Sequence, residues 1–239
     1  MALTAENRSR LAANLVGYSW LESCGSEALD QLLRNAVIDR YEKAQLVELP
    51  GAGVDHLSIL LEGSLEICLN TARGRKFVIG YLPPGQPFGL VPLFDGKAAA
   101  TQTRAHVPSK VLKIPKQDLL AAMQMDQAML HSIMRVLAQR SRRVHLSLAE
   151  MLTLPLSTRL ARLLLSLSAD YGVEQGCKGR AIALRIAQDD LAAMVGVTRQ
   201  RLNIELNSME RNGVVKLAYA RVVVLDEKAL QVQALEPAQ

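Results

Sequence analysis

Residues 187–213 have the sequence AQDDLAAMVGVTRQRLNIELNSMERNG, which predicts two helices joined by a tight turn. Gly196 can adopt the positive φ that ends a first helix, and Thr198 is a residue type that caps the helix after it. Apolar residues recur at helical spacing on both sides of this turn, at Leu191, Met194, Val195, Leu202, Leu206 and Met209. The stretch is therefore predicted to form a helix-turn-helix.

The exposed face of the second predicted helix carries residue types that can read DNA bases. Arginine and glutamine form bidentate hydrogen bonds with guanine and adenine edges, asparagine can read adenine, and an aliphatic side chain can contact the thymine methyl group. The residues expected to read bases in the major groove are Arg199, Gln200, Asn203 and Ile204. An ordinary helical hairpin with a polar surface is the alternative that this local pattern leaves open.

The segment after the second helix predicts a two-stranded wing. Gly213 ends the helix, residues 214–217 and 221–225 form short apolar runs, and residues 218–220 form the turn between them. Residues 198–221 hold five Lys or Arg and two Glu, which leaves a formal charge of +3. Side chains in this region are expected to contact phosphates without reading sequence, namely Thr198, Arg201, Lys216, Tyr219 and Arg221.

The composition of the whole chain limits the classes of protein that it can be. Its 239 residues are enough for two domains, and its formal charge of +5 permits a polyanionic partner without requiring one. Cys24, Cys68 and Cys177 lie too far apart for a Cys-x-x-Cys site, which argues against a disulfide framework or a thiolate metal site. The N-terminus lacks a signal-peptide run, and the longest uncharged run, residues 77–94, is broken by prolines. A cytoplasmic protein without a membrane partner is expected.

Before the helix-turn-helix, the chain changes from helical to strand-like character. Residues 1–43 are predicted to be helical, with one apolar face made of Leu29, Leu32, Leu33 and Ala36. Residues 44–114 contain short apolar runs separated by glycines, which is typical of a jelly roll or barrel, at 57–61, 65–69, 77–82 and 111–114. Arg73, Arg75 and Lys76 are expected on a hairpin, as a solvated face in preference to an anion site.

A long helix is predicted from about residue 117 to residue 152, with a break near Met125 and Asp126. Its second part carries a heptad pattern, which predicts a seam with a parallel partner helix and hence a homodimer, at Leu130, Met134, Leu137, Ser141, Val144, Leu148 and Met151. Packing of this face on the helix's own domain is the alternative. Pro155 then ends the helix and gives a hinge. A further helix is predicted from there to about Tyr171, followed by a loop at residues 172–179. The expected domains are a sensing domain at 1–125, a dimerisation helix at 126–153 and a DNA-binding domain at 154–239.

This order of elements resembles the Crp/Fnr family, the catabolite-activator and fumarate-nitrate-regulator type of bacterial transcription factor. The resemblance covers nearly the whole chain and rests mainly on residues 57–63, on residues 84–89 (PGQPFG) and on residues 195–200 (VGVTRQ). It implies an α+β fold with an N-terminal cyclic-nucleotide-binding-like β-roll, or jelly roll, a long dimerisation helix and a C-terminal winged helix-turn-helix. In such a regulator an effector in the roll repositions two winged helices, and RNA polymerase is an implied partner.

The sequence departs from the cyclic-nucleotide-binding members at the effector pocket, which the resemblance places at Phe88, Gly89, Leu90, Ala99, Ala100, Val144 and His145. Those members hold the ribose with a Glu and the cyclic phosphate with an Arg-Ser pair, and here Leu90 and Ala99-Ala100 stand at these positions. An unpaired buried phosphate is costly, so cyclic AMP is not expected in the usual pose. A small hydrophobic or uncharged effector, or none, is expected instead.

Other cofactors have little support in the sequence. Cys24 alone cannot hold an iron–sulfur cluster, which needs four thiolates. Haem or another metal is kept only as a minor alternative, because isolated histidines are common surface and core residues; the candidate ligands are His56, His106, His131 and His145. No cofactor and no metal is therefore predicted.

Together these features predict a homodimeric, sequence-specific regulator that binds a near-palindromic site on double-stranded DNA. The competing class is a ligand-binding or scaffold protein whose winged helix mediates protein contacts, and the salt dependence of binding would separate the two classes. An enzyme is not expected, because no nucleophile–base pair, carboxylate pair or Gly-rich phosphate loop stands out.

Overall fold

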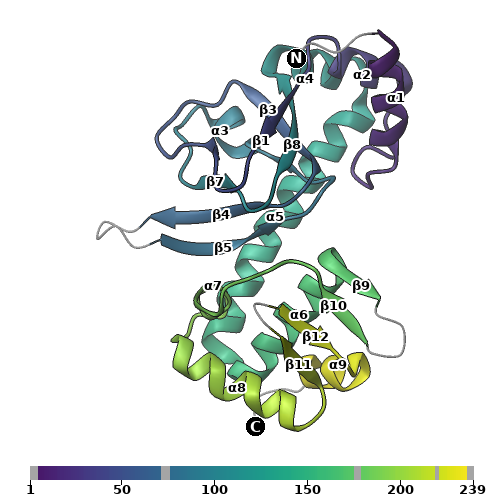
Figure 1. Cartoon of the computed structure of the whole chain (residues 1–239). Helices are drawn as coiled ribbons and strands as arrows, with labels where there is room; N and C mark the ends of the chain where they lie inside the picture. The colour runs from purple at the N-terminus through teal and green to yellow at the C-terminus, as the bar shows by residue number, and fades with distance from the viewer. Residues whose placement is uncertain (1–4, 71–75, 175–178, 219–220, 236–239) are drawn as a thin grey trace. The chain divides into compact units, whose positions relative to one another are not determined.

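The computed structural model describes residues 5–70, 76–174, 179–218 and 221–235 (Figure 1). The chain forms two compact units, an N-terminal unit of Met1–Lys76 with Gly80–Arg143 and a C-terminal unit of Phe77–Ile79 with Val144–Gln239. Within the described residues, no helix is both long and apolar enough to cross a bilayer.

The N-terminal unit is built around two four-stranded sheets. The first has the strand order β1-β8-β3-β6, with bounds Val37–Tyr41, Ser109–Pro115, His56–Glu62 and Pro87–Phe88. The second has the order β2-β7-β4-β5, with bounds Leu46–Glu48, Gln102–Ala105, Leu65–Asn70 and Lys76–Leu82. Because neighbouring strands are rarely consecutive in sequence, the topology is that of the expected roll.

Alternation along the strands gives the N-terminal unit two apolar cores. In β3, Leu57 and Ile59 point to one face of the sheet and Leu60 to the other. The core on the Leu60 side draws on both sheets and contains Tyr41, Leu60, Leu65, Leu82, Phe88, Ala105 and Val111. The core on the opposite face packs the first sheet against a layer of helices, which are α1 (Ala5–Val16), α2 (Ser26–Leu32), α3 (Leu90–Asp95), α4 (Lys116–Met125) and the first part of α5 (Gln127–Thr153).

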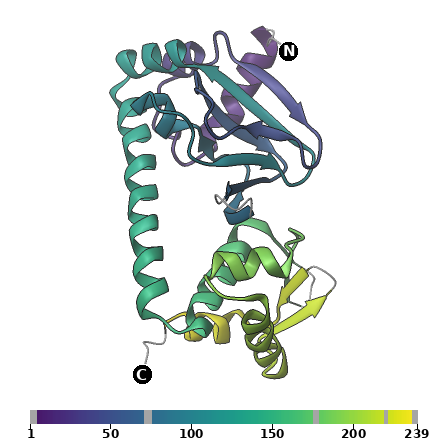
Figure 2. The ribbon, with the colours of Figure 1, turned by 90° about the vertical axis from the view of Figure 1, so that its left-hand side faces the viewer.

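Helix α5 is limited by hydrogen bonds to a carboxylate at its start and by a proline after its end. Its start is fixed by the Asp126 carboxylate, which accepts the N–H groups of Gly25 and Ala128, each at 2.7 Å. These hydrogen bonds hold the pKa of Asp126 below its usual value. Helix α5, the long teal helix in Figure 2, ends at Thr153, two residues before Pro155. The predicted break near Asp126 and the predicted end before Pro155 are confirmed.

The C-terminal unit combines helices with a sheet of strand order β11-β12-β10-β9. Its strands are β9 (Gly172–Glu174), β10 (Arg180–Ile182), β11 (Val215–Ala218) and β12 (Arg221–Val224). Its helices are α6 (Leu156–Tyr171), α7 (Gln188–Met194), α8 (Arg199–Arg211) and α9 (Glu227–Leu235). The fold class expected from the sequence is confirmed: a β-roll, a long helix and a winged helix-turn-helix in one α+β chain.

Two local predictions were wrong. Residues 37–41 form strand β1, and not part of a helical N-terminus, because Val37–Tyr41 pairs antiparallel with β8. The predicted loop at 172–179 begins with strand β9, which pairs with β10 from Gly172 to Glu174. Both segments are short strands, and pairing overrides their helix-like or loop-like composition. The partner is distant in the chain for β1, whereas β9 pairs with β10 in a local hairpin.

Candidate nucleic-acid interface and sensing site

The predicted helix-turn-helix is formed by α7, a tight turn and α8. Gly196 lies in the turn with φ of 71°, a left-handed conformation that a β-carbon would strain. Thr198 caps α8, and its hydroxyl accepts the Arg201 backbone N–H at 3.4 Å. The predicted apolar stripes are buried at Leu191, Val195, Leu202, Leu206 and Met209, while Met194 is half-buried.

The start of α8 presents polar and aliphatic side chains to solvent. Arg199, Gln200 and Arg201 are exposed, and 67% of Ile204 is exposed. Asn203 is half-buried, and its Oδ1 atom has no hydrogen-bond partner. Because positions 199, 200, 203 and 204 share one side of the helix, the predicted base-reading residues lie together. The Arg199 guanidinium is 3.3 Å from the Asp189 carboxylate, in an exposed pair that is worth little in water.

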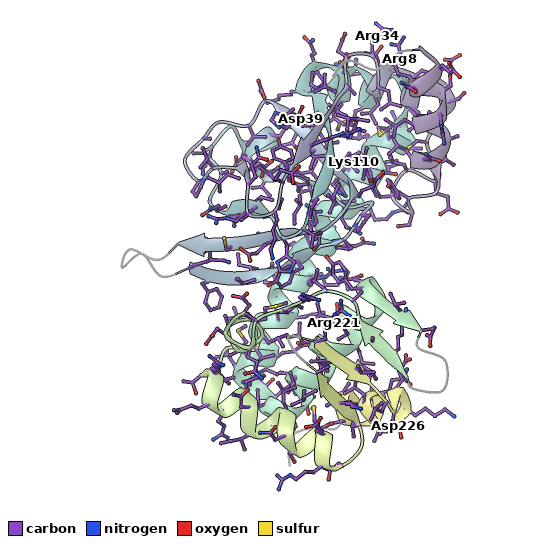
Figure 3. All side chains as sticks on the ribbon, in the orientation of Figure 1. Arg8, Arg34, Asp39, Lys110, Arg221 and Asp226 are labelled. Atoms are coloured by element: carbon purple, nitrogen blue, oxygen red, sulfur yellow. The ribbon has the colours of Figure 1, made fainter. Side chains whose placement is uncertain are left out.

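The wing is attached directly to α8. Strands β11 and β12 pair antiparallel from Val215 opposite Val224 to Ala218 opposite Arg221. The Leu217 backbone N–H donates to the Glu210 carboxylate at 2.7 Å, which links the wing to α8. Lys216 on β11 and Arg221 at the start of β12 are both exposed. Arg221 is labelled in Figure 3. Tyr219 lies outside the described residues.

Arg159 of α6 ties the helix-turn-helix to the end of α5, a role that its place in the sequence does not suggest. Its Nε atom donates to the Val195 carbonyl at 3.2 Å, one residue before the turn glycine. Its Nη1 atom donates to the Leu154 carbonyl at 2.7 Å and to the Met151 carbonyl at 3.4 Å. One guanidinium therefore couples the corner between α5 and α6 to the turn before α8.

Most of the predicted seam on α5 is exposed in the single chain. Val144 and Leu148 have 67% and 58% of their surface exposed, and Met134, Ser141 and Met151 are exposed as well. Leu130 is half-buried, and Leu137 is half-buried against the helix-side core. The buried stripe of α5 is a different one, made of Met129, Ser132, Ile133 and Val136. From Ser141 to Met151 the seam is thus separate from the face that packs on the β-roll, whereas Leu137 also contacts the helix-side core.

The residues predicted for the effector pocket take several different positions. Phe88 is buried between the two sheets, whereas Leu90 is buried in the helix-side core. Gly89 joins them with φ of 79° at the start of α3. Ala99 is buried, with its N–H donating to the Ala52 carbonyl at 3.2 Å. Ala100, Val144 and His145 are exposed, and the last two belong to the C-terminal unit.

Polar side chains next to Gly89 form a group that we call the roll cluster: Glu48, His56, Ser58 and Lys113. Glu48 of β2 faces Thr103 of β7 in the second sheet and interacts with Lys113 of β8 in the first, so its carboxyl group lies between the sheets. A β-carbon on Gly89 would come within 2.9 Å of Glu48 Oε1. Glycine at this position therefore leaves room for the Glu48 carboxyl.

The roll cluster holds buried polar atoms without hydrogen-bond partners, which are Glu48 Oε1, His56 Nε2 and Ser58 Oγ. Burial raises the pKa of Glu48 to about 7, although Lys113 and the Thr103 hydroxyl act in the opposite direction. No local pattern in the sequence predicts this cluster, because its members come from strands that are distant in the chain and next to one another only in the roll. The roll thus contains buried polar groups that the expectation of a small hydrophobic or uncharged effector did not include.

Other candidate ligands lie apart from one another. His56 Nδ1 is 2.7 Å from the Asp55 carboxylate, His106 packs edge-on against Tyr81, and His131 and His145 are exposed on α5. Within the described residues, Cys24 and Cys68 form no disulfide, and Cys177 lies outside those residues. On α5, Arg140 donates to the Pro87 carbonyl, and burial lowers the pKa of its guanidinium. Arg140 thus links α5 to the segment before Gly89.

Two family models match the chain at the positions of these two sites. A cyclic nucleotide-binding domain matches residues 38–126, which include the roll cluster. A Crp-like helix-turn-helix domain matches residues 158–232, which include α7, α8 and the wing.

Known relatives are similar over most of their length. The cAMP-activated global transcriptional regulator Vfr of Pseudomonas aeruginosa is 26% identical over 200 residues, which cover 82% of this chain and 92% of Vfr. The transcriptional regulator LdrP of Thermus thermophilus is 28% identical over 195 residues, which cover 82% of this chain and 95% of LdrP. These relatives are regulators and not enzymes.

Solved structures share the architecture. The crystal structure of a CRP-family transcriptional regulator from Thermus thermophilus matches with a TM-score of 0.69 at 26% identity, over 84% of this chain and 98% of that one. FixK2 from Bradyrhizobium japonicum matches in fold with a TM-score of 0.74 at 16% identity, over 85% of this chain and 99% of FixK2. The roll, the long helix and the winged helix-turn-helix, matched in both sequence and fold, place this chain in the Crp/Fnr family of transcriptional regulators, with a helix-turn-helix DNA-binding domain.

Proposed function

We propose that this protein is a homodimer that binds a near-palindromic site on double-stranded DNA through α8 and the wing. The observation that carries the proposal is the start of α8, where Arg199, Gln200 and Ile204 lie exposed on one side of a helix that is capped at Thr198. A helix of this kind enters the major groove with its N-terminal residues against base edges. Lys216 and Arg221 are exposed on the wing, which supports the proposal that they contact phosphates.

The dimer is proposed from the exposed seam of α5. Val144, Leu148 and Met151 keep apolar surface in water, although the same helix buries another stripe in its own unit. A second copy of α5, parallel to the first, would cover this surface by knobs-into-holes packing. Two winged helices related by a two-fold axis would then read half-sites about one helical turn apart, which makes the site near-palindromic.

The effector is proposed to be uncharged or hydrophobic, or to be absent, and not to be cyclic AMP. Leu90 is buried in the helix-side core and Ala99 offers no cation, so neither can clamp a phosphate or a ribose. The Glu48 carboxyl lies beside Gly89 and would repel an anion there when ionised. Haem stays a minor alternative, with His145 and His131 exposed on α5.

RNA polymerase is a further proposed partner, because a regulator of this class acts at promoters. The site of action proposed from DNA binding is the cytoplasm.

The alternative function is a ligand-binding or scaffold protein whose winged helix binds another protein, and the salt dependence of its binding would differ. Phosphate contacts release counterions and weaken steeply as salt rises, whereas an apolar protein contact does not.

Selection of the full chain against random double-stranded DNA tests the proposal. We expect a two-fold symmetric consensus with half-site centres about 10 base pairs apart, bound with a steep decrease in affinity between low and high salt. An asymmetric consensus, no consensus, or affinity that is independent of salt would contradict it.

In a separate calorimetric titration, cyclic AMP should bind no more tightly than about 1 mM, because the ionic contacts that would supply affinity are missing. Micromolar binding would overturn the effector proposal.

A further inference from the structure

A groove of about 700 Å³ lies on the outer face of the first sheet of the N-terminal unit, beside α1. It is lined by residues of α1, the segment after it and strands β1, β3 and β8, which are Asn7, Arg10, Leu11, Asn14, Tyr18, Ile38, Arg40, Leu61, Glu62 and Lys110. None of these residues belongs to the predicted effector pocket or to the roll cluster. The volume falls in the range that holds small organic ligands.

The wall of the groove formed by α1 is firmly attached. Leu11 and Leu15 of α1 are buried in the helix-side core, and Arg8 Nη1 donates to the Arg34 carbonyl after α2 at 3.2 Å (Figure 3). The residues that α1 turns to the groove, Asn7, Arg10, Leu11 and Asn14, recur at helical spacing. The groove is therefore bounded by a fixed helix face on one side and by a sheet on the other.

The floor of the groove is apolar and its rim is basic. Leu11, Tyr18, Ile38 and Leu61 supply apolar surface, and the Tyr18 ring lies close against Gly85. Three cations come from separate elements, Arg10 from α1, Arg40 from β1 and Lys110 from β8. Arg40 and Lys110 are directly opposite each other in the antiparallel pair, so their side chains share one face of the sheet (Lys110 is labelled in Figure 3).

One carboxylate moderates this positive charge. Glu62 lies 2.8 Å from Lys110 Nζ, in a pair that is partly exposed on both sides. Burial, and to a lesser extent the charge of Glu62, raises the pKa of Tyr18, so its phenol stays protonated and can donate a hydrogen bond. Three cations and one anion leave the lining with a formal charge of +2. Arg10 and Arg40 have no acidic partner among the ion pairs of the described residues.

We propose that this groove is a second small-molecule site of the sensing domain, and that it binds an organic anion with an apolar body. The apolar body would lie on Leu11, Ile38 and Leu61, and a carboxylate, sulfonate or phosphate would meet Arg40 and Lys110. Guanidinium and ammonium groups form charge-assisted hydrogen bonds with such anions. The proposal is independent of DNA binding, because it concerns only the N-terminal unit.

Two fluorescent dyes with nearly the same apolar body separate the two parts of the site. The first is 1-anilinonaphthalene-8-sulfonate, which carries one negative charge, and the second is N-phenyl-1-naphthylamine, which lacks the sulfonate. Titrated into the full chain, the sulfonate dye should bind more tightly. The double variant Arg40→Gln with Lys110→Gln should weaken the sulfonate dye by about tenfold or more and leave the neutral dye nearly unchanged. The exposed cation Lys97, outside the groove, provides the control Lys97→Gln, which should change neither dye.

Two further variants test the effect of the negative charge in the lining and the effect of filling the groove. Glu62→Gln removes the one carboxylate of the lining and should tighten binding of the sulfonate dye by a few-fold, opposite in direction to the loss of a cation. Asn14→Phe fills the groove from an exposed position of α1 and should weaken both dyes. Circular dichroism checks that each variant folds. The proposal is overturned if the sulfonate dye does not bind, binds all variants alike, or binds Glu62→Gln more weakly than the parent chain.

Discussion

Helix α8 and the C-terminal part of α5, residues 144–153, both present a face that has no partner in the single chain, but the two faces have opposite chemistry. On α8 the exposed residues at the start are Arg199, Gln200 and Arg201. On α5 the exposed seam residues are apolar, with Val144, Leu148 and Met151 exposed by 67%, 58% and 41%. Polar side chains are stable in water, whereas each of these apolar side chains gains free energy when it leaves water.

The difference indicates what each face binds. Apolar surface repeated at heptad spacing is covered best by an identical helix, since knobs and holes then match along the whole seam. The α8 face gains little from leaving water unless its partner supplies base edges and phosphates. Glu48 in the roll cluster is a third case, because its Oε1 atom is buried and has no hydrogen-bond partner. Each kind predicts a different response to mutation.

The largest effect is expected at the seam. Replacing Val144 and Leu148 with Asp would place four carboxylates in the two-helix interface, each with a desolvation penalty of several kcal/mol. Sedimentation velocity should then show a folded monomer, and affinity for a palindromic DNA site should fall with it. These positions are cleaner probes than Leu137, which also packs against the helix-side core.

Leu146 supplies the matched control for the seam. It is exposed by 56%, close to Leu148, but lies outside the heptad positions. Leu146→Asp should leave the dimer intact. If Leu146→Asp dissociates the dimer, or if the double variant remains a dimer, the interface lies elsewhere and the comparison between α5 and α8 loses its basis.

The next effect is expected at Glu48. Its folded-state pKa of about 7 lies above the ordinary value of 4.5, so the folded protein binds more protons than the unfolded chain between these pH values. Stability contributed by the neutral carboxyl is therefore complete below about pH 4.5 and is lost as the pH rises to about 7. Glu48→Gln removes this loss and should raise the free energy of unfolding by about 3 kcal/mol at pH 8, with no such gain at pH 4.

Denaturant unfolding at the two pH values measures this effect, with exposed Glu42→Gln as the control. A gain for Glu48→Gln that is equal at pH 4 and pH 8 would mean that the carboxyl does not change its protonation state on folding. A loss at pH 8 would mean that the ionised carboxylate makes a favourable contact with Lys113 that outweighs its burial.

The predictable parts of this molecule are those with local causes. The turn before α8 needs a residue that accepts positive φ and a capping hydroxyl, and Gly196 and Thr198 show both in the sequence. The seam of α5 is a periodic pattern within one helix. Helix caps, turn residues and periodicity depend on neighbours within a few positions, so they can be recognised without knowledge of the fold.

The parts that could not be predicted depend on distant partners. Strand β1 is defined by its pairing with β8, about 70 residues later in the chain. The roll cluster gathers Glu48, Ser58 and Lys113 from three strands, and Arg159 looks like an ordinary polar residue of α6 until its carbonyl partners are known. The proposed domain limits at residues 125 and 153 also remain predictions.

A smaller effect is expected at the base-reading face. Arg199→Ala should cost about 1–3 kcal/mol on the preferred site and relax the preference at one or two base pairs of each half-site. Asp189→Asn should act in the opposite direction, by less than about 1 kcal/mol, because it frees Arg199 from an exposed ion pair. Anisotropy titrations on the preferred and on substituted sites measure both. Equal losses on every sequence would assign Arg199 to phosphate and not to a base.

The smallest effect is expected on the wing, where the interaction is with phosphate alone. Lys216→Gln or Arg221→Gln should weaken binding to preferred and unrelated DNA by similar factors, so the ratio of the two affinities should survive. For each phosphate that a subunit no longer neutralises, the slope of log K against log salt should decrease in magnitude by about 0.9. Lys228→Gln changes an exposed cation on α9, a helix that packs against α6, and should leave the slope unchanged. If the wing variants altered base preference but not the slope, the division between a reading helix and a positioning wing would be wrong.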